Sequence, residues 1–122
     1  LGWEVWGDGM DLKDFLYIDD CIDGILLAME NLDEFEPVNI ASGKPVTIRQ
    51  VLGEILNAAD YNDADIHYDS SKPTMIPKRM IDISLAKEKL GFEPKVSLEE
   101  GIHKTVEWYK EYYKNSSPED KK

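Results

Sequence analysis

The sequence predicts an α/β fold in which about four helices surround a small mixed sheet. Two observations support this prediction. Apolar residues recur at helical spacing in four stretches, and short alternating or β-branched stretches lie between them. The 122 residues, 42% of them hydrophobic, suit one domain with a modest core. We place this domain at residues 1–114, followed by a disordered polar tail at 115–122.

Residues 1–6 have the pattern of a strand although the first residue is not methionine, so we expect a fragment of a larger protein. A glycine-flanked turn follows, and the mostly apolar residues 15–18 predict a short strand. Asp19 or Asp20 can then cap the first helix, where both acids suit the positive end of the dipole. This helix carries an apolar stripe of Ile22, Ile25, Leu26, Met29 and Leu32.

A short strand is predicted at residues 37–41, before a turn at 42–45. Thr47 and Gln50 then form a capping box for the second helix. The apolar residues of that helix are Ile48, Val51, Leu52, Ile55, Leu56 and Ala59.

Residues 66–69 alternate as a strand does. A loop at 70–77 leads to a short third helix, which Asp82 or Ser84 caps and Gly91 ends. Ala86 and Leu90 should face inward from it. Ser97 and Glu100 form a second capping box for the fourth helix, whose apolar face is Leu98, Ile102, Val106, Tyr109 and Tyr113.

The chain is strongly acidic, with a net charge of −11 and a sequence pI of about 4.5. Such a surface repels nucleic acid and anionic lipid, so neither is an expected partner. The single cysteine, Cys21, fits a reducing compartment. Because the sequence shows no signal-like segment and no bilayer-spanning apolar run, we expect a cytoplasmic protein.

Metal and dinucleotide sites are poorly supported. Asp8, Asp11 and Asp14 recur every third residue, which is not the spacing of a calcium loop. The potential zinc ligands Cys21, His67 and His103 stand on distant elements. The turn at residues 7–9 lacks the third glycine of a dinucleotide fingerprint. We therefore predict no metal ligands and no cofactor-binding residues in this chain.

Three cations remain as candidates. Lys13 lies between the glycine turn and the predicted strand, and Lys78 and Arg79 follow the proline loop. Each alone is an ordinary solvated charge, but together they could converge on a diphosphate.

Three segments resemble a known family: "VWGDG…KDFLYIDD", "VNIASGKPVTIRQV" and "SKPTMIPKRMIDISLAKEKLGFEPKVSLEEGIHKTVEWY". They are similar to the C-terminal, substrate-binding part of the extended short-chain dehydrogenases/reductases, the NAD(P)-dependent nucleotide-sugar epimerases and dehydratases. Within that family they are most similar to the GDP-L-fucose synthases. The resemblance covers residues 5–109. Together with the alternation, it implies that residues 3–6 lie parallel to residues 66–69.

The resemblance implies that this chain binds a nucleotide-diphosphate sugar. Lys13 stands where the family has an arginine in the loop over the nucleotide sugar, followed by Asp14 and Phe15. The family's second diphosphate-contacting arginine corresponds to Lys78 or, after a one-residue shift, Arg79. The implied substrate-binding residues are therefore Lys13, Phe15, Lys78 and Arg79. Lysine supplies charge without the bidentate fork of arginine.

The family's glycine-rich cofactor loop and catalytic Tyr-x-x-x-Lys pair belong to its N-terminal half. The Tyr68–Lys72 spacing runs from a strand into a loop, and we interpret it as coincidence. We expect no catalytic residues here, and NAD or NADP bound only by the parent protein through a missing N-terminal Rossmann domain. A non-catalytic nucleotide-binding or interaction module that kept the fold is the alternative. Without the missing sheet, the first helix should be partly uncovered, giving a homodimer or a frayed monomer.

Overall fold

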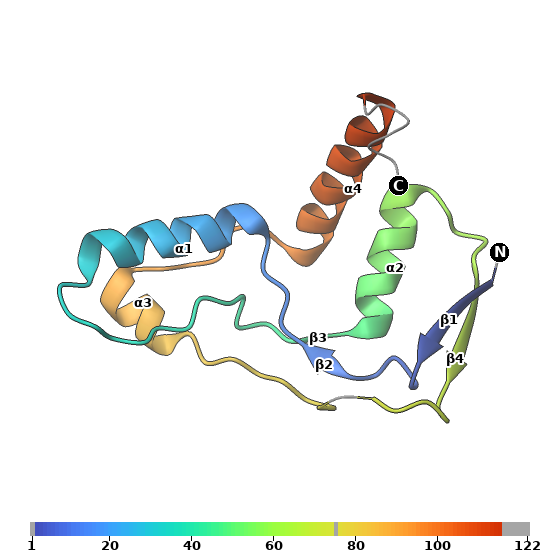
Figure 1. Cartoon of the computed structure of the whole chain (residues 1–122), viewed down its shortest axis with the longest axis horizontal. Coiled ribbons are helices and arrows are strands. Elements are labelled where there is room, and N and C mark those ends of the chain that lie inside the picture. Colours follow the sequence, from blue (N-terminus) through green and yellow to red (C-terminus); the bar gives the residue numbers. More distant parts are fainter. Residues whose placement is uncertain (1, 75, 116–122) are drawn as a thin grey trace.

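The computed structural model describes residues 2–74 and 76–115, and the elements within them confirm the predicted α/β class (Figure 1). Leu1 and the predicted tail at 116–122 lie outside the described residues, while Asn115 ends the last helix. In chain order the elements are β1 (Gly2–Trp6), β2 (Leu12–Lys13), α1 (Ile18–Asn31), β3 (Val46–Thr47), α2 (Ile48–Ala59), β4 (Asp65–Asp69), α3 (Ser84–Leu90) and α4 (Leu98–Asn115).

β1 and β4 form a parallel pair, which confirms the prediction made from their alternation and the family resemblance. Trp3 lies opposite Ile66, and Trp6 opposite Asp69. The carboxyl ends of both strands therefore meet at the same edge. There the Gly7 amide donates to the Asp69 carbonyl at 2.8 Å, which continues the pairing into the glycine turn.

A second, antiparallel pair joins β2 to β3, with Leu12 opposite Thr47 and Lys13 opposite Val46. The strand predicted at residues 15–18 is wrong, because β2 already ends at Lys13. The two carboxylate oxygens of Asp14 then each accept a backbone amide, from Ser42 and Gly43, at 2.8 Å. α1 then begins at Ile18. A strand exists only where a neighbour completes its hydrogen bonds, and here that neighbour meets the chain earlier.

The strand predicted at residues 37–41 is also wrong. In the described residues no strand lies beside this segment, whose side chains pack against helices instead. Val38 and Ile40 contact the buried cluster between α1 and α3, and Asn39 donates its amide to the Asp82 carbonyl at 3.2 Å. The segment is thus an irregular connection between α1 and β3 that packs against the buried cluster.

The caps predicted for the later helices are confirmed in part. The N-cap residue of α3 is Ile83, which makes no side-chain cap, and not Asp82 or Ser84, although the Asp82 carboxylate accepts the Ser84 amide at 2.8 Å. Thr47 and Gln50 form the complete capping box of α2. Ser97 accepts the Glu100 amide at the start of α4, but the Glu100 carboxylate pairs with Lys104 at 2.7 Å, so only half of that box forms. α3 ends at Gly91 in the left-handed conformation, with φ 63°, as predicted.

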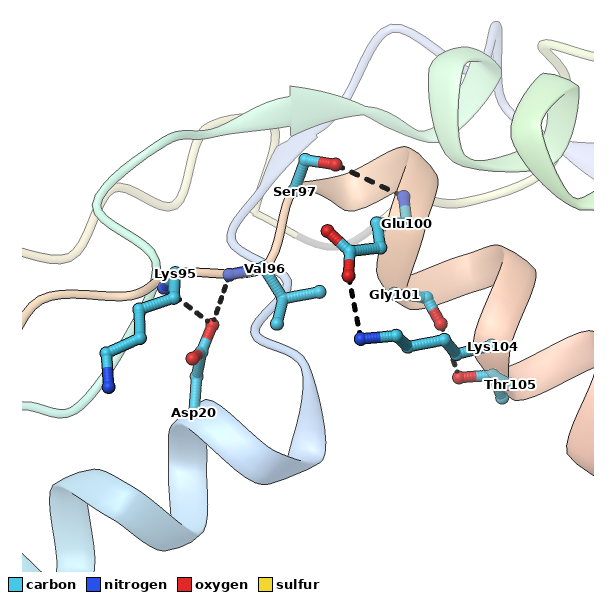
Figure 2. A network of polar contacts seen from close by, with 8 residues as sticks. All are labelled: Asp20, Lys95, Val96, Ser97, Glu100, Gly101, Lys104 and Thr105. Carbon is cyan, nitrogen blue, oxygen red and sulfur yellow. Dashed lines mark hydrogen bonds and ion pairs between the residues drawn. The ribbon is translucent and has the colours of Figure 1, made fainter.

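Neither Asp19 nor Asp20 caps α1, which corrects the sequence-based assignment, although both lie in the first turn of the helix. Tyr17 is the N-cap residue and makes no side-chain cap. Figure 2 shows the Asp20 carboxylate directed instead at the segment before α4, where Oδ2 accepts the amides of Lys95 at 3.0 Å and Val96 at 2.9 Å. Asp20 is only 3% exposed. It therefore joins the start of α1 to the entry of α4.

The helices form two pairs, α1 beside α3 and α2 beside α4 (Figure 1). The buried cluster lies with the first pair and consists of Ala86, Leu90 and Phe92, with partly buried side chains around it. The inward positions predicted for Ala86 and Leu90 are confirmed. Phe92 lies outside any periodic stretch of the sequence, so its place in the core was not predicted.

α1 leaves most of its predicted apolar stripe in solvent. Leu32 does not belong to that stripe, because it follows the helix as its C-cap residue and packs against the buried cluster. Ile22, Ile25 and Leu26 are each about half exposed, and Met29 is 76% exposed. The side that faces the protein carries Asp20, Gly24 and the partly buried Leu27 and Ala28. The expectation that the stripe is only partly covered is confirmed.

Across residues 2–74 and 76–115, the helices lack the combination of length and apolar character that a membrane span requires.

Replacing Asp20 should loosen the contact between α1 and α4. We expect Asp20→Ala to lower the free energy of unfolding by about 1–3 kcal/mol, because two backbone amides lose their acceptor. Urea denaturation measures this loss. Asp19→Ala is the matched control in the same helical turn, and its effect should stay below about 1 kcal/mol. Equal losses in both variants would contradict the role given to Asp20.

The exposed stripe of α1 should drive self-association of the isolated chain. We expect Ile25→Glu to weaken it about tenfold or more, since a carboxylate replaces an apolar contact worth roughly 1.5–3 kcal/mol. Helicity should be retained because Ile25 is 51% exposed. Sedimentation velocity over a concentration series checks this. Asn31→Glu adds the same charge off the stripe, and an equal effect there would contradict the assignment.

Candidate functional site

The backbone segments that carry the candidate cations lie side by side at β2. This strand pairs with β3 on one side and with the residues after Pro77 on the other. The Leu12 amide donates to the Pro77 carbonyl at 2.8 Å, and the Arg79 amide donates to the Leu12 carbonyl at 2.9 Å. Two segments far apart in sequence are thereby fixed side by side. Lys13 lies on one of them, and Lys78 and Arg79 on the other.

The side chain of Lys13 already has partners. Its Nζ donates to the Ile76 carbonyl and lies 3.6 Å from Oδ2 of Asp11. The side chain is 23% exposed. Lys78 and Arg79 are exposed, and the Phe15 ring is 40% exposed. The site thus contains one partly buried lysine side chain and two exposed cations.

The glycine turn before β2 is tightly packed. Gly7 and Gly9 have φ values of 84° and 73°, which confirms the turn. A Cβ atom at Gly9 would lie 2.6 Å from the Tyr68 ring and 2.7 Å from Cγ of Arg49. The Asp8 carboxylate accepts the Met10 amide at 2.9 Å. The turn therefore orients the chain into β2.

This turn does not fit a dinucleotide. The space beside Gly9 is filled by Tyr68 and Arg49, and the chain continues into β2 where a cofactor loop would begin a helix. No chemical step is therefore assigned to NAD within this chain. Among the residues that the structure describes, no three His, Cys, Asp or Glu side chains form a group that could hold a metal. Asp14 instead binds backbone amides.

Arg49 belongs to the site region although the sequence did not single it out. Its backbone amide donates to the Gly9 carbonyl at 3.0 Å, and its Nε donates to the Asp8 carbonyl at 2.7 Å. Its guanidinium carbon lies 4.0 Å from the centre of the Tyr68 ring. A cation in the first turn of a helix is unfavourable next to the positive end of the helix dipole. The position of Arg49 at the start of α2 was therefore the one sequence signal that it contacts another part of the chain.

Tyr68 and Lys72 hold places unlike those of a catalytic pair. Tyr68 lies in β4 under the Arg49 guanidinium. Lys72 follows in a turn, where its Nζ is 4.0 Å from Asp69 and 5.9 Å from the centre of the Trp6 ring. Hydrogen bonds from Ser71 to the Asp69 carboxylate lower the pKa of that group. These contacts organise the end of β4.

A separate hollow of about 460 Å³ lies between α2 and α4. Its lining includes the carboxylates of Glu54, Glu99 and Glu100, and the Glu100 carboxylate is paired with Lys104 (Figure 2). Excess negative charge makes this hollow unsuited to a phosphate. The cations around β2 are the better candidate for an anionic ligand.

Comparison with known proteins supports a common family. A family model described as GDP-mannose 4,6 dehydratase matches residues 3–105. The chain is 38% identical to a probable GDP-L-fucose synthase of Oryza sativa subsp. japonica over 107 residues, which is 88% of this chain and 32% of the relative. It therefore spans about a third of the length of that relative.

Solved structures agree in fold. UDP-glucose 4-epimerase from Thermotoga maritima, solved with UDP-glucose, matches with a TM-score of 0.81 and 37% identity, over 92% of this chain and 36% of that one. UDP-glucuronic acid 4-epimerase from Bacillus cereus, in complex with NAD, matches with a TM-score of 0.77 and 27% identity, over 94% of this chain and 35% of that one.

The glycine turn yields a direct test with an internal control. We expect Gly9→Ala to destabilise the chain by about 1–3 kcal/mol, because φ is positive and the new methyl group meets Tyr68 and Arg49. Gly53→Ala should stabilise by about 0.5–1 kcal/mol, since its Cβ meets nothing within 4 Å on α2. Thermal unfolding of both variants measures this. A neutral Gly9→Ala would show that the turn is not packed as described.

Proposed function

The chain belongs to the GDP-mannose 4,6-dehydratase family of nucleotide-sugar epimerases, dehydratases and reductases, and on this premise we propose that it binds the substrate for a larger enzyme. The proposed ligand is a nucleotide-diphosphate sugar, with its diphosphate beside Lys13, Lys78 and Arg79. The observation that supports the proposal is the pairing of β2 with the residues after Pro77, since the backbone segments that carry these three residues then lie side by side.

Charge explains why the local arrangement matters. A chain with a net charge of −11 repels a diphosphate at long range, so cations at the site must supply the attraction. Arg79 can offer a planar fork to two phosphate oxygens, whereas Lys13 and Lys78 offer point charges. The Phe15 ring supplies an apolar surface next to this segment.

Lys13 must break a hydrogen bond within the chain before its ammonium can bind a phosphate. Its Nζ would give up the Ile76 carbonyl for a charged oxygen, which is the stronger acceptor. Asp11, 3.6 Å away, stays beside it and offsets part of its charge. Binding through Lys13 should therefore be weaker than binding through an arginine that keeps its fork free.

Within the family, a GDP-L-fucose synthase-like activity of the parent protein is the finer proposal. The 38% identity to a probable GDP-L-fucose synthase supports it, although the 37% identity to a UDP-glucose 4-epimerase is nearly equal. The parent would bind NAD or NADP, as the NAD complex of the related 4-epimerase suggests. That cofactor would lie in a part of the parent other than this chain.

The exposed stripe of α1 fits a contact with that other part. The solved relatives are about three times as long as this chain. Half-exposed Ile22, Ile25 and Leu26 form the kind of apolar surface that a second domain covers. We place the cofactor-binding Rossmann domain against this stripe.

A non-catalytic binding module remains the second candidate, because Lys13 replaces the arginine that the family resemblance implies. The sequence of the parent protein discriminates between the two. A glycine-rich loop and a helical Tyr-x-x-x-Lys pair upstream of this chain would favour the enzyme, and a parent without them would favour the module.

Titration with GDP-mannose and UDP-glucose tests the proposed site. We expect amide signals around Lys13 and around Lys78 and Arg79 to shift together in NMR spectra, and the binding to weaken as salt rises. Lys13→Gln and Arg79→Gln should each reduce affinity about tenfold, because each removes a charge-assisted contact. Lys87→Gln on α3 is the control. A response in one region only, or a diffuse one, would contradict convergence.

A further inference from the structure

We infer that Arg49 is a positioning residue for the proposed diphosphate site. It holds the turn at residues 7–9 and thereby the register of β2, which carries Lys13. The inference rests on the proposed function, which supplies the ligand, but the hold on the turn can be measured without any ligand.

Arg49 contacts the turn through both backbone and side chain. Its amide donates to the Gly9 carbonyl at 3.0 Å, and its Nε donates to the Asp8 carbonyl at 2.7 Å. Two successive carbonyls of the turn are thus fixed by one residue of α2. Neither of these contacts involves a side chain of the turn, so they define the path of its backbone.

The same side chain ties the turn to the sheet. The Arg49 guanidinium lies 4.0 Å from the centre of the Tyr68 ring, and Tyr68 is paired with Val5 of β1. Gly9 packs against both of these side chains, because a Cβ there would meet both. Arginine suits this place, since a planar guanidinium can stack on a ring while its Nε donates in the plane. A lysine cannot do both.

The contacts continue without a break to Lys13. Beyond Gly9, the Ile48 amide donates to the Asp11 carbonyl at 3.2 Å, Thr47 lies opposite Leu12, and Val46 lies opposite Lys13. β2 and β3 are only two residues each, so their own ladder is short. A slip of one residue would turn Lys13 to the other face. The Arg49 contacts lie at the end of this ladder and oppose such a slip.

Binding measurements test the inference. We expect Arg49→Gln to weaken binding of GDP-mannose or UDP-glucose, whichever the chain binds more tightly, by about tenfold. Tyr68→Leu should act similarly, because the stacking surface is lost, and Tyr68→Phe should bind like the original chain. All variants are compared where circular dichroism shows them to be folded. Gly91→Ala, which strains the left-handed end of α3 away from the turn, should lower stability without the loss of affinity.

Amide exchange in the ligand-free chain separates the two proposals. Arg49→Gln should speed exchange of the Gly7 and Leu12 amides about tenfold and leave the amides of α4 unchanged. If the original chain binds neither sugar, the proposed function fails while this measurement still tests Arg49. Unchanged exchange overturns the positioning role, even with a loss of affinity, because Arg49 would then act on the ligand directly. An equal loss of affinity in Gly91→Ala also overturns it.

Discussion

The arrangement of this chain depends on a buried carboxylate near the start of α1. Asp20 accepts two backbone amides 75 and 76 residues away, at the entry of α4. A buried charge is costly unless hydrogen bonds replace its water, and here two amides do so. The contact places α4, α4 packs on α2, and the first turn of α2 holds the glycine turn. The strand that carries Lys13 thus depends on a side chain outside its own sheet.

Aspartate carboxylates accept backbone amides in segments that have no partner strand. Both described sheets have only two strands, so much of the connecting chain cannot satisfy its amides through a ladder. Asp14 serves the amides of Ser42 and Gly43, as Asp20 serves those of Lys95 and Val96. Some of the acidity of this chain therefore has a structural use. β2 differs from these connecting segments, because it has backbone partners on both sides. The cations beside β2 therefore lie on paired backbone.

Local signals predicted much of the fold. The periodicity of α2 and α3, the capping box of α2, the glycine end of α3 and the alternation within β1 and β4 depend on residues close in sequence, whereas the parallel pairing of those two strands was predicted with the help of the family resemblance. The role of Asp20 could not be predicted that way, because a capping rule considers only neighbouring amides. The strand was predicted at residues 15–18 and not at Leu12–Lys13, because the position of β2 depends on distant partners, namely β3 and the residues after Pro77. The family resemblance indicated Lys13, Lys78 and Arg79 but not Arg49, whose contacts are with backbone and a ring.

The exposed stripe of α1 gives one helix two energetic contexts. In the isolated chain, Met29 is 76% exposed, so shortening its side chain removes few contacts and alters folding little. If the proposed second domain covers the stripe, the same shortening would leave a void in a packed interface and cost about 2–5 kcal/mol. Mutational tolerance measured on this chain alone would therefore understate the selective constraint on α1. The helix would look permissive in one setting and intolerant in the other, with no change in its own conformation.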